Sequence, residues 1–355
     1  MKRIILTGGG TAGHVTPNIA LIPKLRELGY DIQYIGSYNG IEKELIEPFE
    51  IPYHGISSGK LRRYFSLQNF TDPFRVIKGF GEARKLIKGL KPDVIFSKGG
   101  FVSVPVVLAG KRCKVPVIIH ESDMTPGLAN KLAIPSAVKV CCNFPETLDA
   151  LPEGKAVLTG SPIRQELLTG DKDAARKMCG FTDEKPVILV IGGSLGAVAV
   201  NEAVRAALPE LLKQFQIIHL CGKGKVDHSL KEIKGYCQFE YIKNELRDLF
   251  ALADVVISRA GANAICELLA LRKPNLLIPL SARASRGDQI LNAHSFERQG
   301  FSLVIEEEQL TNATLLDAVH NLYENREQFI NAMHNSGQQD PIATIISLIE
   351  EAAAK

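Results

Sequence analysis

Short apolar runs alternate with amphipathic stretches along the first 160 residues. The apolar runs, rich in β-branched residues, predict buried strands over residues 3–7, 31–35, 94–97, 115–120 and 139–142. The stretches between them have helical spacing. Strands that alternate with helices predict right-handed βαβ units and an open parallel sheet covered on both faces, with ligands beyond the carboxyl ends of the strands.

The same pattern recurs in the second half of the chain. Strands are predicted over residues 187–191, 216–221, 239–242, 254–258 and 274–279, and a last helix over residues 341–354. A Gly-Ser-Pro segment after residue 159 places a linker near residues 161–166. The pattern therefore predicts an α/β protein with two Rossmann-like domains.

A glycine turn follows the first predicted strand. Gly8-Gly9-Gly10-Thr11-Ala12-Gly13-His14 leads directly into a predicted helix. Glycines allow close backbone approach, and the N–H groups of a helix N-terminus attract a phosphate. An imidazole such as that of His14 titrates near neutrality, so it can accept a proton from a sugar hydroxyl. The alternative is a tight strand-to-helix turn with an ordinary polar histidine.

Gly8, Gly10 and Gly13 also match the G-x-G-x-x-G pattern of dinucleotide sites. The second predicted strand argues against NAD, because it ends in Tyr34-Ile35-Gly36-Ser37, without a carboxylate for the adenosine ribose.

A second glycine turn, Gly192-Gly193-Ser194-Leu195-Gly196-Ala197, follows the strand at residues 187–191. Gly192-x-Ser194-x-Gly196 matches the nucleophile elbow of hydrolases, which also needs a later histidine in a loop. The downstream candidate, His294, falls in a helical pattern instead. We favour an anion cradle for a diphosphate.

A third turn at Gly261 opens a helix that carries Glu267. A carboxylate one or two turns into such a helix can accept both hydroxyls of a ribose. Asp288 and Gln289 stand where a later loop becomes a helix, and their polar groups suit sugar hydroxyls. The alternative for Glu267 is a solvated side chain on a helix.

Composition limits the class of protein. The chain has 355 residues, 45% hydrophobic and 23% charged, enough for about two globular domains. It contains no run of 18 apolar residues and no signal-peptide pattern, so we expect no transmembrane helix. The seven cysteines are odd in number and lack metal-ligand spacing, which favours reduced thiols in the cytoplasm. Asp171-Lys172-Asp173 resembles a metal-binding D-x-D, but its place at a helix start favours an N-cap.

Positive charge is concentrated in residues 60–91, which hold nine basic and two acidic side chains in a chain of net charge +3. Aromatic residues lie among them, a combination that suits an anionic membrane surface. The predicted contacts are Arg62, Arg63, Phe65, Phe70, Phe74, Arg75 and Lys78. The alternatives are a core helix with a lysine-coated outer face and, less favoured, a nucleic-acid site, because the glycine loops indicate a small phosphate ligand.

An ordered set of motifs carries a family resemblance that covers nearly the whole chain. The set comprises Thr7 to Pro17, Lys98-Gly99-Gly100-Phe101-Val102-Ser103, His120-Glu121-Ser122-Asp123, Gly160-Ser161-Pro162-Ile163-Arg164, Gly192 to Ala197, Ser258 to Ala262, Cys266-Glu267 and Asp288-Gln289. Together they resemble the peptidoglycan N-acetylglucosaminyltransferases that convert lipid I to lipid II. The chain departs from the family pattern at Ala12, where some members have glycine, and at Ser122-Asp123, where the pattern has Gln-Asn.

The resemblance implies a GT-B fold, with two Rossmann-like domains facing across a cleft. Residues 1–163 would bind the acceptor and the membrane, residues 164–340 would bind UDP-N-acetylglucosamine, and a helix over residues 341–355 would return to the first domain. The implied reaction moves N-acetylglucosamine, with inversion, to the C4 hydroxyl of the N-acetylmuramoyl group of undecaprenyl-diphosphate-linked lipid I. It would take place at the cytoplasmic face of the plasma membrane, by a peripheral enzyme without a metal or other cofactor, to serve cell-wall synthesis.

The resemblance also assigns residues. His14 would be the catalytic base, and Gly10, Phe101, His120 and Glu121 would lie on the acceptor side. Asp123 is placed beside these acceptor residues and also among the donor contacts. The other donor contacts would be Thr11, Ala12, Gly13, Arg164, Ser194, Ile242, Ala262, Asn263, Ala264, Ile265, Cys266, Glu267 and Gln289.

Two further hypotheses stay open at this point. One is another UDP-sugar enzyme of the same fold, either a glycolipid synthase or a UDP-N-acetylglucosamine 2-epimerase; an epimerase would not need the basic aromatic stretch at a membrane. The other is a non-enzymatic nucleotide-binding or membrane-docking protein, which predicts no turnover.

Overall fold

The computed structural model describes residues 1–59, 68–182, 185–193, 196–242, 244–337 and 340–354, with the backbone alone for residues 68–73. The chain divides into two compact units, Met1–Arg164 with Gln338–Lys355, and Gln165–Gly337. The sequence predicts this boundary one residue earlier, after residue 163.

The described part of the first unit forms a seven-stranded parallel sheet in the order β3-β2-β1-β4-β5-β6-β7. The strands are β1 (Arg3–Thr7), β2 (Asp31–Ser37), β3 (Tyr53–Ile56), β4 (Val94–Ser97), β5 (Val117–Glu121), β6 (Lys139–Cys142) and β7 (Ala156–Leu158). The helices are α1 (Thr16–Glu27), α2 (Ile41–Ile46), α3 (Gln68–Leu90), α4 (Ser103–Arg112), α5 (Leu128–Ala133), α6 (Pro145–Asp149) and α14 (Pro341–Ala353). The five predicted strands are present; the apolar pattern does not predict β3 and β7.

Among its described residues, the second unit forms a similar, six-stranded parallel sheet in the order β10-β9-β8-β11-β12-β13. Its strands are β8 (Val187–Ile191), β9 (Gln216–Leu220), β10 (Tyr236–Phe239), β11 (Val255–Ser258), β12 (Asn275–Leu277) and β13 (Ser302–Val304). Its helices are α7 (Lys172–Met178), α8 (Val198–Gln214), α9 (Leu246–Leu252), α10 (Ala262–Ala270), α11 (Asp288–Arg298), α12 (Asn312–Glu324) and α13 (Arg326–His334). The strand predicted over residues 239–242 is wrong by three residues, because β10 ends at Phe239.

The order of strands fixes where ligands can bind. In the first sheet the order reverses between β1 and β4, and in the second between β8 and β11. Loops that leave the carboxyl ends of two such strands diverge to opposite faces and leave a crevice there. Both predicted glycine turns therefore lie at switch points, one in each unit.

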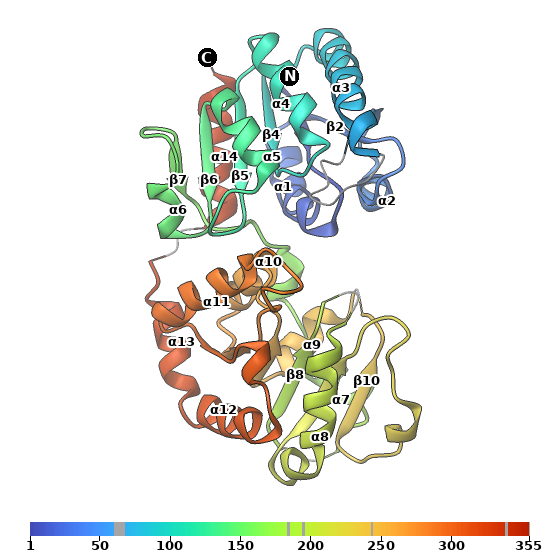
Figure 1. Cartoon of the computed structure of the whole chain (residues 1–355), viewed down its shortest axis with the longest axis vertical. Helices are drawn as coiled ribbons and strands as arrows, with labels where there is room; N and C mark the ends of the chain where they lie inside the picture. Colours follow the sequence, from blue (N-terminus) through green and yellow to red (C-terminus); the bar gives the residue numbers. More distant parts are fainter. Residues whose placement is uncertain (60–67, 183–184, 194–195, 243, 338–339, 355) are drawn as a thin grey trace. The chain divides into compact units, whose positions relative to one another are not determined.

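The last helix completes the core of the first unit. Ile342, Ile345, Ile346 and Ile349 recur at helical spacing and are buried with Leu21 and Leu25 of α1. Each such side chain contributes about 1.5–3 kcal/mol through burial. The Asp340 carboxylate caps the helix by accepting hydrogen bonds from the N–H groups of Ile342 and Ala343. Figure 1 shows this red helix among the blue and green elements of the first unit.

Candidate active site

The first glycine loop is held against the loop that follows β4. The Gly9 N–H donates to the Gly99 carbonyl at 3.4 Å. A Cβ on Gly100 would lie 2.2 Å from the Gly9 carbonyl oxygen, and a Cβ on Gly8 would lie 2.4 Å from the His14 carbonyl oxygen. These positions need glycine because backbone passes where a side chain would begin. The result is a compact pair of loops at the β1–β4 switch point.

His14 ends a short 3-10 turn (Ala12–His14) between this loop and α1. Its side chain is half-buried. The ring Nδ1 lies 3.0 Å from the Thr11 hydroxyl, which fixes the orientation of the imidazole. That His14 acts as the catalytic base, and that Thr11 contacts the donor, stay predictions.

His120 and Glu121, at the end of β5, are buried and face inward. His120 Nε2 donates to the Gly160 carbonyl at 2.9 Å. Burial, followed by the charge of Lys98, holds the pKa of His120 well below its usual value, so this imidazole stays neutral. The Glu121 carboxylate accepts hydrogen bonds from the N–H groups of Ser122, Asp123 and Gly127 and from the Asn130 amide.

These bonds define a structural role for the two residues. They shape the turn after β5, while the half-buried Phe101 and Asp123 stand closer to solvent. That all four residues line an acceptor site stays a prediction, as do the contacts assigned to Gly10, Ala12 and Gly13.

The second glycine turn packs tightly on the end of β9. A Cβ on Gly196, whose φ is +69°, would lie 1.9 Å from the Cys221 carbonyl oxygen. Ala197, the N-cap of α8, provides no side-chain cap, so the start of α8 offers backbone N–H groups. Ser194, predicted to face the donor, lies outside the described residues.

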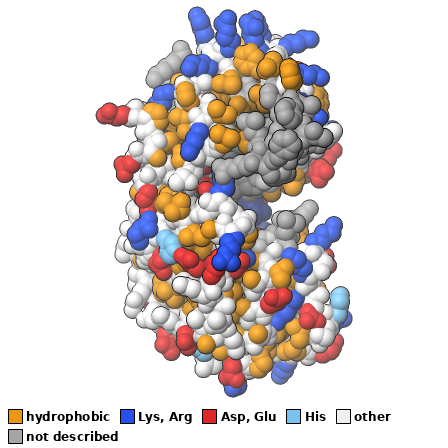
Figure 2. Space-filling view, in the orientation of Figure 1, with side chains coloured by type: hydrophobic (Ala, Val, Ile, Leu, Met, Phe, Trp, Pro, Cys, Tyr) orange, Lys and Arg blue, Asp and Glu red, His pale blue; other side chains and the backbone are white. Residues whose placement is uncertain are grey.

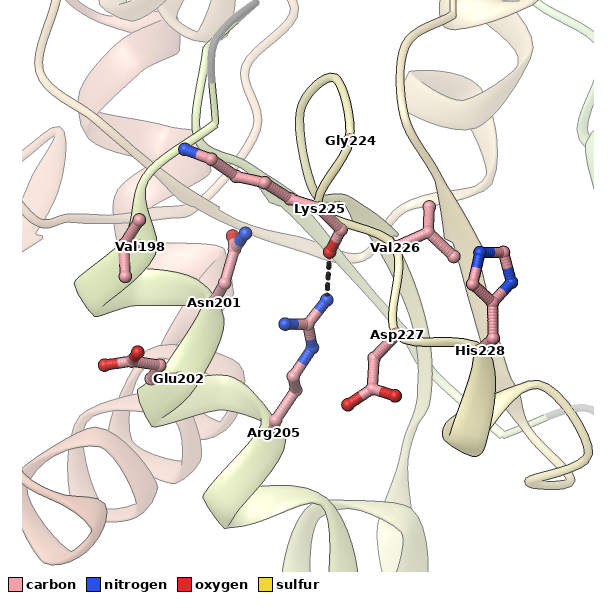
Figure 3. A pocket seen from close by; sticks show the side chains of 9 residues that line it. All are labelled: Val198, Asn201, Glu202, Arg205, Gly224, Lys225, Val226, Asp227 and His228. Carbon is pink, nitrogen blue, oxygen red and sulfur yellow. Dashed lines mark hydrogen bonds between the residues drawn. The ribbon is translucent and has the colours of Figure 1, made fainter.

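A cavity of about 380 Å³ lies beside this turn, between α8 and the loop after β9. Lys225 crosses it toward the start of α8 (Figure 3), and its ammonium donates to the Gly196 carbonyl at 3.3 Å. Arg205 supports the loop by donating to the Lys225 carbonyl at 2.6 Å and to Gln238 Oε1 at 3.1 Å. The structure therefore places the ammonium group of Lys225 at the second glycine turn.

The sequence analysis does not predict the place of Lys225 at this cavity. The signal that could have revealed it is Gly222-Lys223-Gly224-Lys225, a basic glycine turn directly after a strand.

Helix α10 presents only part of the predicted segment to solvent. Asn263, Ala264 and Glu267 are half-buried on one face, whereas Ala262, Ile265 and Cys266 are buried in the core. Contact with a ligand through side chains is therefore limited to the first three. At Gly261, the N-cap, a Cβ would meet no atom within 4 Å, so the approach to the helix N-terminus is open.

The remaining predicted donor residues lie in loops or at helix starts. Gln289, in the first turn of α11, accepts a hydrogen bond from the Leu280 N–H at 3.0 Å. Arg164 is half-buried at the end of the first unit, and Ile242 is half-buried in the loop after β10. Their contacts with a ligand stay predictions.

The structure supports the N-cap interpretation of Asp171-Lys172-Asp173. The Asp171 carboxylate accepts hydrogen bonds from the N–H groups of Asp173 and Ala174, as a helix N-cap does. Within the described parts of the chain, no group of three or more His, Cys, Asp or Glu side chains is arranged to hold a metal ion.

From Gln68 onward, where the structure describes it, the basic stretch forms α3, whose two faces differ. Ala83 and Ile87 are buried in the core, whereas Phe74 and Ile77 are 74% and 68% exposed. Arg75 and Lys78 are exposed beside them. Arg62, Arg63 and Phe65 lie outside the described residues, as does the side chain of Phe70. None of the described helices is both long and apolar enough to span a bilayer.

Comparison with known proteins identifies the family. Residues 4–142 match the glycosyltransferase family 28 N-terminal domain, and residues 187–349 match its C-terminal domain. A protein of Lachnoclostridium phytofermentans named UDP-N-acetylglucosamine--N-acetylmuramyl-(pentapeptide) pyrophosphoryl-undecaprenol N-acetylglucosamine transferase is 69% identical over the full length of both chains. A protein of the same name from Clostridium tetani is 61% identical over 99% of this chain and 98% of its own.

Solved structures agree with this assignment. The crystal structure of MurG from Acinetobacter baumannii is 26% identical, covers 99% of this chain and 100% of its own, and gives a TM-score of 0.78. The structure of a UDP-N-acetylglucosamine 2-epimerase from Methanocaldococcus jannaschii shares the fold, with a TM-score of 0.68. It is 14% identical and covers 98% of this chain and 100% of its own. The chain has the GT-B fold, with two parallel-sheet units. It belongs to glycosyltransferase family 28, as an N-acetylglucosamine transferase of the same kind as these relatives.

Proposed function

We propose that the chain catalyses one glycosyl transfer, in which the glycine loop of the first unit binds the acceptor and that of the second unit binds the donor. The reaction moves N-acetylglucosamine from UDP-N-acetylglucosamine to the C4 hydroxyl of the N-acetylmuramoyl group of lipid I, with inversion, and yields lipid II for peptidoglycan synthesis. The observation that carries this function is the 69% identity over the full chain to a transferase of that name. The epimerase alternative is not favoured, because epimerase structures share only the fold.

The first glycine loop would receive the diphosphate of lipid I. It lies at the β1–β4 switch point, and its short distance along the chain from His14 would bring the sugar hydroxyl near the imidazole. A neutral imidazole that donates from Nδ1 to the Thr11 hydroxyl keeps its lone pair on Nε2. That nitrogen would accept the proton of the C4 hydroxyl as the hydroxyl attacks the anomeric carbon.

The second unit would receive the donor. The N-termini of α8 and α10, both at the β8–β11 switch point, carry partial positive charge that would stabilise the leaving UDP. Lys225 would add a full positive charge beside the first of these helices. Glu267, on the solvent-facing side of α10, would accept hydrogen bonds from the ribose hydroxyls.

Calorimetric titration with UDP-N-acetylglucosamine tests the donor assignment. Replacing Glu267 by Ala removes a charged hydrogen-bond acceptor, worth about 1.5–3 kcal/mol, so we expect the Kd to rise about 10- to 100-fold. Glu210→Ala, an exposed residue near the far end of α8, is the matched control and should leave the Kd within about 2-fold. An unchanged Kd in folded Glu267→Ala would remove Glu267 from the donor site.

The first unit would dock on the cytoplasmic face of the plasma membrane as a peripheral protein. Figure 2 shows Lys and Arg side chains gathered over the part of this unit that holds α3 and α4. Phe74 and Ile77 would enter the interfacial region while Arg75 and Lys78 bind anionic head groups.

Flotation with vesicles tests this docking. We expect binding to vesicles of phosphatidylglycerol and little binding to phosphatidylcholine vesicles. The double variant Phe74→Ser/Ile77→Ser should weaken binding at least about 10-fold, whereas Leu168→Ser, an exposed apolar residue of the second unit, should not. Equal binding of wild type and the double variant would refute docking through α3.

A further inference from the structure

A carboxylate is buried directly beneath the first glycine loop. Glu42, on α2, is fully buried. Its Oε1 accepts hydrogen bonds from the Ser37 N–H at 2.9 Å and the Ser37 hydroxyl at 2.5 Å, and its Oε2 accepts one from the Gly10 N–H at 3.1 Å. Burying a carboxylate is costly unless such donors surround it, so this arrangement is specific for an acceptor-only group.

Three glycines from separate segments make the space for this carboxylate. A Cβ on Gly9 would lie 2.5 Å from Glu42 Cδ, and one on Gly36 would lie 2.8 Å from Glu42 Cγ. A Cβ on Gly40 would lie 2.3 Å from each carboxylate oxygen. Side chains at any of the three would displace Glu42 or be displaced by it. The glycine loop, the end of β2 and the start of α2 therefore form one slot around Glu42.

The Glu42 carboxylate binds a backbone N–H group of the glycine loop, as an external anion would. Gly10, whose φ is +85°, turns the loop back toward Thr11 and His14, and its N–H is committed to Glu42. Backbone N–H groups in such loops otherwise serve external phosphates. The hydrogen bond to Glu42 therefore makes the Gly10 N–H unavailable to an incoming diphosphate.

We propose that Glu42 is a positioning residue for the acceptor, which fixes the Gly8–Gly10 backbone so that His14 and the remaining loop amides meet lipid I in a preformed arrangement. This inference rests on the proposed use of the first glycine loop by the acceptor. Preorganisation lowers the cost of ordering the loop when substrate binds, so its loss should appear in the acceptor kinetics and not in donor binding.

Glu42→Gln tests the proposal most simply. The amide retains the volume but turns an N–H₂ group toward one of the donors that now meet the carboxylate. We expect kcat/KM for a short-chain lipid I analogue to fall about 10- to 100-fold, with the Kd for UDP-N-acetylglucosamine within about 2-fold of wild type. Hydrogen exchange in the peptide that spans residues 8–14 should become faster. Glu44→Gln, an exposed residue of the same helix, is the control and should change none of these values.

Gly40→Ala displaces the carboxylate without removing its charge. Gly40 has a φ of −91°, which alanine adopts without strain, so the added methyl group acts through Glu42 and Ser37. We expect Gly40→Ala to reproduce the loss in acceptor kcat/KM, and Gly40→Ala/Glu42→Ala to be no worse than Glu42→Ala alone.

Two results would overturn the proposal: normal acceptor kinetics in folded Glu42→Gln, or fully additive losses in the double variant. Failure of the underlying function is a separate outcome, because the wild-type protein itself would then transfer no sugar to the lipid I analogue.

Discussion

The hydroxyl of Tyr34 lies 2.7 Å from the carbonyl oxygen of Gly8 and donates a hydrogen bond to it. Both groups are buried, and burial raises the pKa of Tyr34 far above its usual value, so the hydroxyl stays protonated. The Asn18 amide donates to the same hydroxyl at 3.3 Å and to the Thr7 carbonyl at 3.2 Å. Strand β2 and helix α1 therefore hold the first glycine loop through polar contacts.

Tyr34→Phe should destabilise the protein by about 1–3 kcal/mol, because it leaves the buried Gly8 carbonyl and an Asn18 N–H without this partner. Urea denaturation, followed by the fluorescence of a label on the first unit, measures the difference. Tyr241→Phe, whose side chain is 57% exposed, is the control and should be neutral. If Tyr34→Phe were as stable as wild type, the hydrogen bond from Tyr34 to the Gly8 carbonyl would not contribute to stability.

His14→Ala should reduce kcat by about 10²–10⁴ while leaving the urea midpoint unchanged, since the imidazole is proposed to accept a proton in the transition state. Thr11→Val should cause a smaller loss and alter the pH–rate profile, because the Nδ1 contact at 3.0 Å is removed. His334→Ala, an exposed imidazole at the end of α13 in the second unit, should behave like wild type. Near-normal turnover in His14→Ala would assign the base elsewhere.

The last helix is joined to the rest of the first unit by pH-dependent hydrogen bonds of Glu350. Glu350 accepts hydrogen bonds from Tyr30 and, at 2.9 Å, from Lys2. The Tyr30 hydrogen bond first, and then that of Lys2, lower the pKa of Glu350. A lowered folded-state pKa gives stability that is present above the unfolded pKa and is lost as the pH falls through the folded value.

Glu350→Gln should therefore be less stable than wild type at neutral pH, and this difference should shrink as the pH is lowered from about 5 toward about 3. The effect will be small because Glu350 is 39% exposed. Thermal denaturation across this range is the measurement. Glu351→Gln, an exposed neighbour, is the control; a difference that is constant with pH would contradict the linkage.

Much of the fold could be predicted from apolar periodicity, and the exceptions have physical causes. Strand β8 is a continuous apolar run and strand β1 has three apolar residues in succession, so their positions follow directly from the sequence. Strand β3, Tyr-His-Gly-Ile, has only half-buried residues before Ile56 and shows no apolar run. Strand β13 has three residues, too few to show a period. Such edge strands are defined by pairing with a neighbour, which sequence spacing does not encode.

The candidate site could be predicted less completely. The glycine turns are visible in the sequence because backbone geometry restricts several of their positions to glycine, and His14 is visible as a titratable side chain directly after the first turn. Glu42 is not, since a glutamate in a short amphipathic helix is usually solvated, and only the tertiary structure brings Gly9, Gly36 and Gly40 around it. The inward direction of His120 and Glu121 is equally hidden, because their place at the end of a strand does not determine which way a loop turns.

Transfer of radiolabelled N-acetylglucosamine from its UDP donor to a short-chain lipid I analogue, with EDTA present, tests the central claim most directly. We expect one N-acetylglucosamine per acceptor, joined by a β-1,4 linkage, at the same rate with and without EDTA. The absence of product, with UDP-N-acetylglucosamine still bound to the protein, would contradict the assignment of lipid I as acceptor and would leave only the donor half of the mechanism.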